Sequence, residues 1–149
     1  MSAKGIAYLL LDVGGEVFGL DLELVEAVIP YARPDAVPFQ RRDTVEALLY
    51  RGKFMGVADL GRLLGLKQTP EEGRAVIAVV ETGGAHVGLI ASASLGLLRA
   101  VDLGDEARVM GKWEGPFLGH SVKYGERVAH IVDFDALIGD FAGRLERSA

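Results

Sequence analysis

The chain contains no cysteine, and this absence removes several classes of chemistry at once. Disulfide bonds, thiol catalysis and cysteine-ligated zinc sites all need that side chain. Long apolar runs are also absent: the longest uncharged stretch, residues 83–98, is interrupted by polar residues and is shorter than the roughly 20 apolar residues that span a bilayer. Residues 1–5 carry no signal-like segment. We therefore expect neither export nor membrane insertion, and a cytoplasmic location.

A basic stripe of the kind that holds phosphates is missing too. The net charge is −5, with acidic and basic residues mixed along both halves of the chain. A nucleic-acid-binding barrel would present aromatic side chains interleaved with basic ones. Here Arg41 and Arg42 form the one adjacent basic pair, and Phe39 is the one aromatic residue near it. We expect no nucleic-acid partner.

Glycine pairs mark two similar hairpins in a chain whose residues are 50% hydrophobic, enough to form a core. The stretch GGEVFGLDL begins at Gly14, GGAHVGLIA begins at Gly83, and each follows an apolar run. A two-residue turn of the favoured hand needs positive φ at both central positions, which glycine adopts without strain. The sequence predicts one hairpin over residues 8–20 and another over residues 75–90.

A second pair of segments also repeats. RGKFMGVADLGRLLG ends at Gly65 and YGERVAHIVDFDALIG ends at Gly139. In each, Asp59 or Asp133 can cap the free amides at the start of a short helix, and the final glycine can adopt the left-handed exit conformation. Corresponding segments lie roughly 70 residues apart, which favours two similar β-rich modules over chance.

The predicted fold is all-β, with two small barrels, because short strands punctuated by glycine turns do not suit a parallel sheet with crossover helices. The expected first barrel spans residues 14–74 and the second spans residues 75–149, with the N-terminal strand, residues 6–13, available to pair with the second. We expect one helical turn capped by Asp21 and a C-terminal helix over residues 133–147.

Four segments follow one another along the chain: FGLDLELVEAVI, YRGKFMGVADLGRLLG, HVGLIASASLGLL and GERVAHIVDFDALI. In this order and spacing they resemble the CheW-like domain, an adaptor of bacterial chemotaxis. The most specific piece is Arg51-Gly52 followed by Asp59-Leu60. The resemblance implies that residues 1–149 form one such domain, built from two intertwined five-stranded SH3-like barrels with short helices. It also implies an adaptor without catalysis or cofactor.

The partners that the resemblance implies are proteins. They are the regulatory domain of a CheA-type histidine kinase and the cytoplasmic tips of chemoreceptors, which would place the protein at receptor arrays. The expected protein-binding residues are Arg51, Gly52, Val25, Val28 and Leu49. Taken without the resemblance, an arginine in a turn is a solvated charge and the two valines are core residues. An adaptor for twitching motility or another chemosensory output is an open alternative.

Three positions depart from the usual pattern of that family. Glu46 stands where a glycine is usual, Leu49 replaces the asparagine of the central turn, and Ser92 stands where the second hairpin usually continues into an aspartate. These departures leave open whether a receptor or kinase contact is altered.

An alternative from another class is a small hydrolase using Ser121 and His130, with Asp133 near them. Nothing marks Ser121 as a nucleophile, since no Gly-x-Ser-x-Gly elbow surrounds it. This alternative predicts a pocket joining the two side chains, whereas the adaptor hypothesis predicts an exposed apolar groove and no pocket with shifted titrating groups. No histidine pair has a metal-binding spacing, so we expect His86 to be structural and the chain to have no metal site.

Overall fold

The computed structural model describes residues 7–31, 46–82, 84–99, 108–109, 118–124 and 126–137. Their strands are β1 (Ala7–Val13), β2 (Glu16–Asp21), β3 (Val25–Pro30), β4 (Glu46–Tyr50), β5 (Lys53–Asp59), β6 (Val76–Thr82), β7 (Ala85–Ala91), β8 (Ala93–Arg99), β9 (Arg108–Val109), β10 (Leu118–Tyr124) and β11 (Arg127–Val132). The helices are the 3-10 turn η2 (Leu22–Leu24) and α1 (Leu60–Leu64). The all-β prediction is confirmed.

Both predicted hairpins form. Strands β1 and β2 pair antiparallel from Val13 opposite Glu16, and Gly14 and Gly15 between them have φ of 59° and 92°. Strands β6 and β7 pair antiparallel over their whole length. Positive φ at a two-residue turn matches the twist of the flanking strands, which is why glycine pairs occur there.

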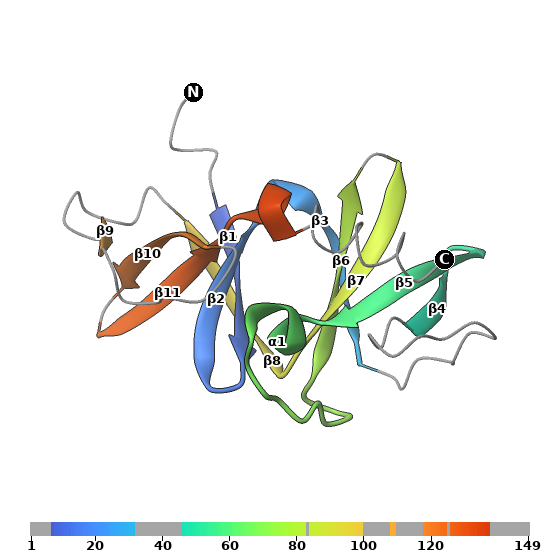
Figure 1. Ribbon diagram of the computed structural model, residues 1–149, viewed down its shortest axis with the longest axis horizontal. Helices are drawn as coiled ribbons and strands as arrows, with labels where there is room; N and C mark the ends of the chain where they lie inside the picture. The colour runs from blue at the N-terminus through green and yellow to red at the C-terminus, as the bar shows by residue number, and fades with distance from the viewer. Residues whose placement is uncertain are drawn as a thin grey trace.

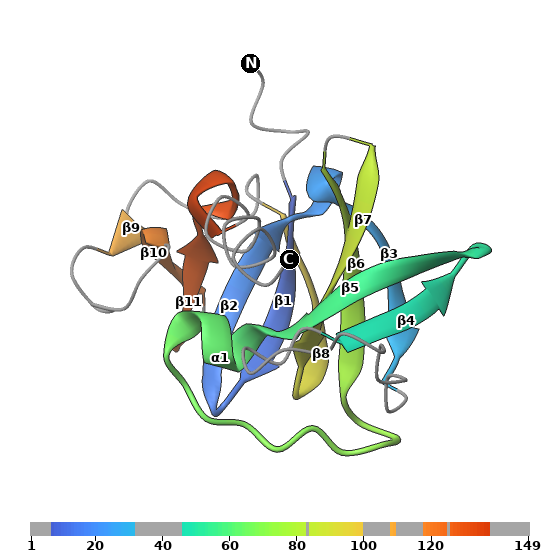
Figure 2. The same cartoon turned by 45° about the vertical axis from the view of Figure 1, so that its right-hand side comes forward.

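The strands form two sheets that lie side by side (Figures 1 and 2). The first sheet has the order β8-β1-β2-β11-β10-β9, with the two-residue β9 at its edge, and the second has the order β3-β6-β7-β5-β4. Parallel pairs join β2 to β11 and β7 to β5. The first sheet therefore combines the hairpin β1–β2 of the first repeat with strands of the second half of the chain. The second sheet combines the hairpin β6–β7 of the second repeat with β3, β4 and β5 of the first half.

The two sheets do not follow the expected division into a first barrel over residues 14–74 and a second over residues 75–149, because each sheet contains strands from both halves of the chain. Hairpin β6–β7 belongs with β3 and β5 in the second sheet, and β2 belongs in the first. The reason is that β3 leaves its own hairpin to pair with β6, and β8 leaves its own hairpin to pair with β1. The N-terminal strand thus does pair with a strand from the second half of the chain.

Three apolar clusters fill the fold, one in each sheet and a central cluster between the sheets. Leu9, Leu11 and Val13 of β1 enter the central cluster, whereas Leu10 enters the cluster of the first sheet. Because alternate side chains of a strand point to opposite faces, a strand buried on both faces must be apolar throughout. This explains the apolar run YLLL, which half-buried Asp12 separates from buried Val13.

Short capped helices lie between the two sheets (Figure 1). Asp59 accepts hydrogen bonds from the amides of Gly61 and Arg62, and Gly65 ends α1 with φ of 78°. Asp133 accepts from the amide of Ala136, and residues 134–137 are helical. Both predicted caps are confirmed, as is the turn capped by Asp21. The rest of the predicted C-terminal helix, with Gly139, lies outside the described residues.

No helix within the described ranges is both long enough and apolar enough to cross a membrane.

Candidate functional site

The turn between β4 and β5 presents Arg51 and Gly52, the two residues of the motif on which the resemblance depends. Their φ values are 51° and 80°, and among the described residues Arg51 is the one non-glycine residue with positive φ. A two-residue hairpin turn of this hand demands that conformation, which an arginine adopts at a cost in free energy. The strained turn holds the Arg51 side chain at the tip of the hairpin.

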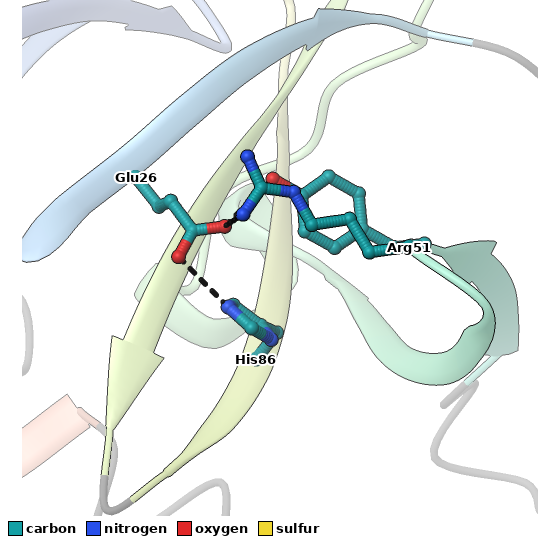
Figure 3. Close-up of polar contacts among 4 residues, drawn as sticks. Glu26, Arg51 and His86 are labelled. Atoms are coloured by element: carbon teal, nitrogen blue, oxygen red, sulfur yellow. Dashed lines mark hydrogen bonds and ion pairs between the residues drawn. The ribbon is translucent and has the colours of Figure 1, made fainter.

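Arg51 reaches across to strand β3. Its Nη1 lies 3.4 Å from Oε2 of Glu26, and its guanidinium carbon lies 5.5 Å from the centre of the Tyr50 ring (Figure 3). The side chain is 70% exposed. An exposed ion pair of this kind contributes little to stability, so the guanidinium can be released at small cost.

Glu26 is the centre of a larger group of contacts, which we name the Glu26 cluster: Glu26, Tyr50, Arg51 and His86. The Tyr50 hydroxyl donates to Oε2 of Glu26 at 2.8 Å, and His86 Nε2 lies 2.9 Å from Oε1. The hydrogen bond with His86, and then that from Tyr50, lower the pKa of the Glu26 carboxyl. The same carboxylate raises the pKa of Tyr50, because it stabilises the protonated phenol.

The three other predicted binding residues differ in exposure. Val25 is half-buried and packs against the central cluster. Val28, further along β3, is 40% exposed. Leu49 is 61% exposed and lies opposite Phe54, which is 72% exposed, on the β4–β5 hairpin. Leu49 and Phe54 form an exposed apolar pair beside the Arg51 turn.

A cleft of about 410 Å³ runs beside this turn. It is lined by Tyr50, Arg51, Lys53, Phe54, Met55, Gly84, Ala85 and His86. Since the pKa of Tyr50 is raised, the expectation that no pocket would hold a shifted titrating group is wrong.

Sequence reasoning missed Glu26, Tyr50 and Phe54. One weak signal could have pointed to Glu26. The residues of β3 alternate between half-buried and exposed, and Glu26 is one of the exposed residues. His86 was expected to be structural, and it does have polar and aromatic partners, with its ring 5.3 Å from that of Tyr50. The contacts of Glu26 with Tyr50 and His86 span 24 and 60 residues of sequence, so no local pattern encodes them.

The departure at Ser92 has a structural explanation, whereas nothing in the structure explains the one at Glu46. The Ser92 hydroxyl donates to Oε1 of Gln68 at 2.6 Å, and Nε2 of Gln68 donates to the carbonyl of Ile90 and to Asp59. Ser92 therefore helps to anchor the segment after α1. The backbone of Glu46 pairs with Val57 at the start of β4.

Ser121 and His130 are direct cross-strand partners on β10 and β11, with 2.9 Å between Ser121 Oγ and His130 Nδ1. Each is only 4% exposed, and the ring of Phe18 lies 5.4 Å from that of His130. Glu16 lies 3.4 Å from His130 Nε2, whereas Asp133 caps the helical turn instead. The pair meets, but its burial closes it to a substrate from solvent.

A family model for the CheW-like domain matches residues 7–142. The chain belongs to the CheW-like domain family. Among solved structures, the scaffolding protein TtCheW from Thermoanaerobacter tengcongensis is similar, with a TM-score of 0.70, 20% sequence identity and coverage of 85% of this chain and 88% of that chain. No curated protein sequence matches the chain.

These matches confirm the predicted fold of two SH3-like barrels. The chain is therefore of the CheW-like scaffold and adaptor type of chemotaxis. Near Arg51 this CheW-like domain presents the exposed apolar pair Leu49 and Phe54 beside a charged turn. Such a combination is common on protein-binding surfaces, so it suits a scaffold.

Proposed function

We propose that this CheW-like domain couples chemoreceptors to a CheA-type histidine kinase as a non-catalytic adaptor in the cytoplasm, at membrane-associated receptor arrays. The observation that carries the proposal is the family match over residues 7–142. The kinase partner would be its regulatory domain, and the receptor partner would be the helical cytoplasmic tip.

The β4–β5 hairpin is the surface that we assign to a protein partner. Among the described strands, β4 is an edge of the second sheet, and an edge strand can pair with another chain. Leu49 and Phe54 would supply apolar area on burial, and Arg51 would supply a polar anchor. Gly52 sets the turn, Val28 extends the exposed surface on β3, and Val25 acts from within by supporting β3.

Calorimetric titration with the regulatory domain of a CheA-type kinase from the same genome tests the proposal. We expect saturable binding in the micromolar range that weakens about tenfold or more in Arg51→Ala and in Phe54→Ser. Arg127→Ala is the matched control, since Arg127 lies beside the turn of the corresponding hairpin β10–β11 and is exposed. Absence of binding to every such kinase would refute the coupling role and leave the fold assignment intact.

The phenotype of a gene deletion distinguishes a role in chemotaxis from a role in twitching motility. Deletion of the gene should abolish directed swimming if the chemotaxis assignment is right. Loss of surface twitching with normal swimming would instead support the alternative adaptor role.

A further inference from the structure

Three side chains with metal-binding atoms meet near the turn of hairpin β6–β7 in the second sheet. Glu81 of β6 and His86 of β7 are direct cross-strand partners. Glu26 lies on β3 at the point where the register of β3 against β6 shifts by one residue. A bulged residue changes the direction of its side chain relative to the ladder, and here Glu26 joins the other two. One carboxylate oxygen from each glutamate and one His86 nitrogen all lie within 4.8 Å of one another.

The charges around this trio are unbalanced. Glu26 is paired with Arg51 and hydrogen-bonded by Tyr50 and His86. The carboxylate of Glu81, in contrast, has no hydrogen-bond or ion-pair partner within the part of the chain that the structure describes, although it faces the same point. The two carboxylates carry a charge of −2, and the Arg51 guanidinium offsets one unit of it through its ion pair with Glu26. A small cation of charge two that displaced the guanidinium would balance both carboxylates.

We propose that Glu26, Glu81 and His86 bind one divalent transition-metal ion, of which Zn²⁺ is the best fit. Imidazole nitrogen with carboxylate oxygen suits zinc, whereas Ca²⁺ and Mg²⁺ prefer sites made of oxygen alone. Three protein ligands leave a fourth position for water.

The spacing of the ligand atoms is compatible with such a site. Two ligands of a tetrahedral zinc ion lie about 3.3 Å apart, given metal–ligand distances of about 2.0–2.1 Å. His86 Nε2 and Glu26 Oε1 are now 2.9 Å apart, so they must separate by only a few tenths of an ångström. Glu81 is exposed and can rotate inward to complete the set.

Binding of the ion would compete with Arg51 for Glu26. The ion would neutralise the carboxylate and repel the guanidinium, which is 70% exposed and free to swing away. The site therefore adds a ligand class that the adaptor proposal does not include, and it links that ligand to the position of Arg51.

Titration calorimetry of the full chain with Zn²⁺ alone tests this inference, with Co²⁺ added in parallel to read the coordination geometry from its visible spectrum. We expect one saturable site, weakened about tenfold or more in Glu81→Gln. Glu81 is exposed, so that variant should fold, and thermal unfolding checks this. In Arg51→Ala, removal of the competing cation should tighten binding about fivefold.

Glu71→Gln, which removes an exposed carboxylate outside the trio, is the control and should bind as the parent does. Absence of a saturable site, or equal affinity in Glu81→Gln and the parent, would overturn the proposal. Equal affinity in Arg51→Ala would overturn the competition with Arg51. The titration uses neither receptor nor kinase, so its failure is distinguishable from failure of the adaptor proposal.

Discussion

Gly88 packs directly against Ile77, so closely that a methyl group added at residue 88 would lie 2.8 Å from the Cγ2 atom of Ile77. The same methyl group would lie 3.1 Å from Met55 Cε and 3.2 Å from Val57 Cγ2. All three neighbours belong to the cluster of the second sheet. Gly19, the corresponding glycine of the first repeat, has the same relationship with Ile131, at 2.7 Å. The glycines of the two Gly-Leu pairs thus make room for facing side chains inside each barrel.

We expect Gly88→Ala to lower the free energy of unfolding by about 1–3 kcal/mol, because overpacking a rigid core forces neighbours from their rotamers. Gly19→Ala should cost less, since the atom it meets is the terminal Cδ1 of Ile131, which can rotate away, whereas Cγ2 of Ile77 is fixed on a branched carbon. Urea denaturation of both variants measures the difference. Equal stability of Gly88→Ala and the parent would contradict the packing argument.

Asp59→Ala should lower the free energy of unfolding by about 1–2 kcal/mol, since it removes the cap of α1. It also removes the acceptor for Gln68, whose side chain ties the segment after α1 to β7. Asp59→Asn keeps an oxygen that can accept from the same amides and should recover most of the loss. Thermal unfolding of the two variants provides the test, and an equal loss in both would argue against capping.

Ser121→Ala should destabilise the fold by about 1–3 kcal/mol, because it removes the hydrogen-bond partner of Nδ1 on buried His130. It should have no effect on hydrolysis of a p-nitrophenyl ester, since the pair is closed to solvent. Denaturation and an esterase assay on the same samples separate the two roles. Esterase activity in the parent that disappears in Ser121→Ala would revive the hydrolase alternative.

The two halves of the chain should not fold separately. A fragment of residues 75–149 would contain β6 and β7 without β3 and β5, and β10 and β11 without β2. Each half would expose apolar faces that the central cluster now buries. We expect the separate fragments 1–74 and 75–149 to give poorly dispersed amide spectra, and the full chain to give a dispersed one. A dispersed spectrum from either fragment would show that its sheet is autonomous.

The sequence by itself determined the local structure and the family of this protein. Gly14 and Gly15 adopt the positive φ that their turn requires, Asp59 caps the amides two and three residues later, and Gly65 ends the helix. These features depend on conformational preferences and on contacts within a few residues, so their sequence patterns are sufficient evidence. The order of the same motifs indicated the CheW-like domain.

Only the tertiary structure decided which strands share a sheet and which polar groups meet. Both hairpins of the repeat look alike in sequence, and nothing local says that β3 pairs with β6 or that β8 pairs with β1. The contacts of Glu26 with Arg51 and His86 follow from such long-range pairings. The packing of His130 against Phe18 likewise depends on the pairing of β11 with the distant strand β2. Such contacts depend on how the apolar faces of distant strands pack together. A hydrophobic pattern in the sequence indicates that a face is buried, but it does not indicate which other strand covers that face.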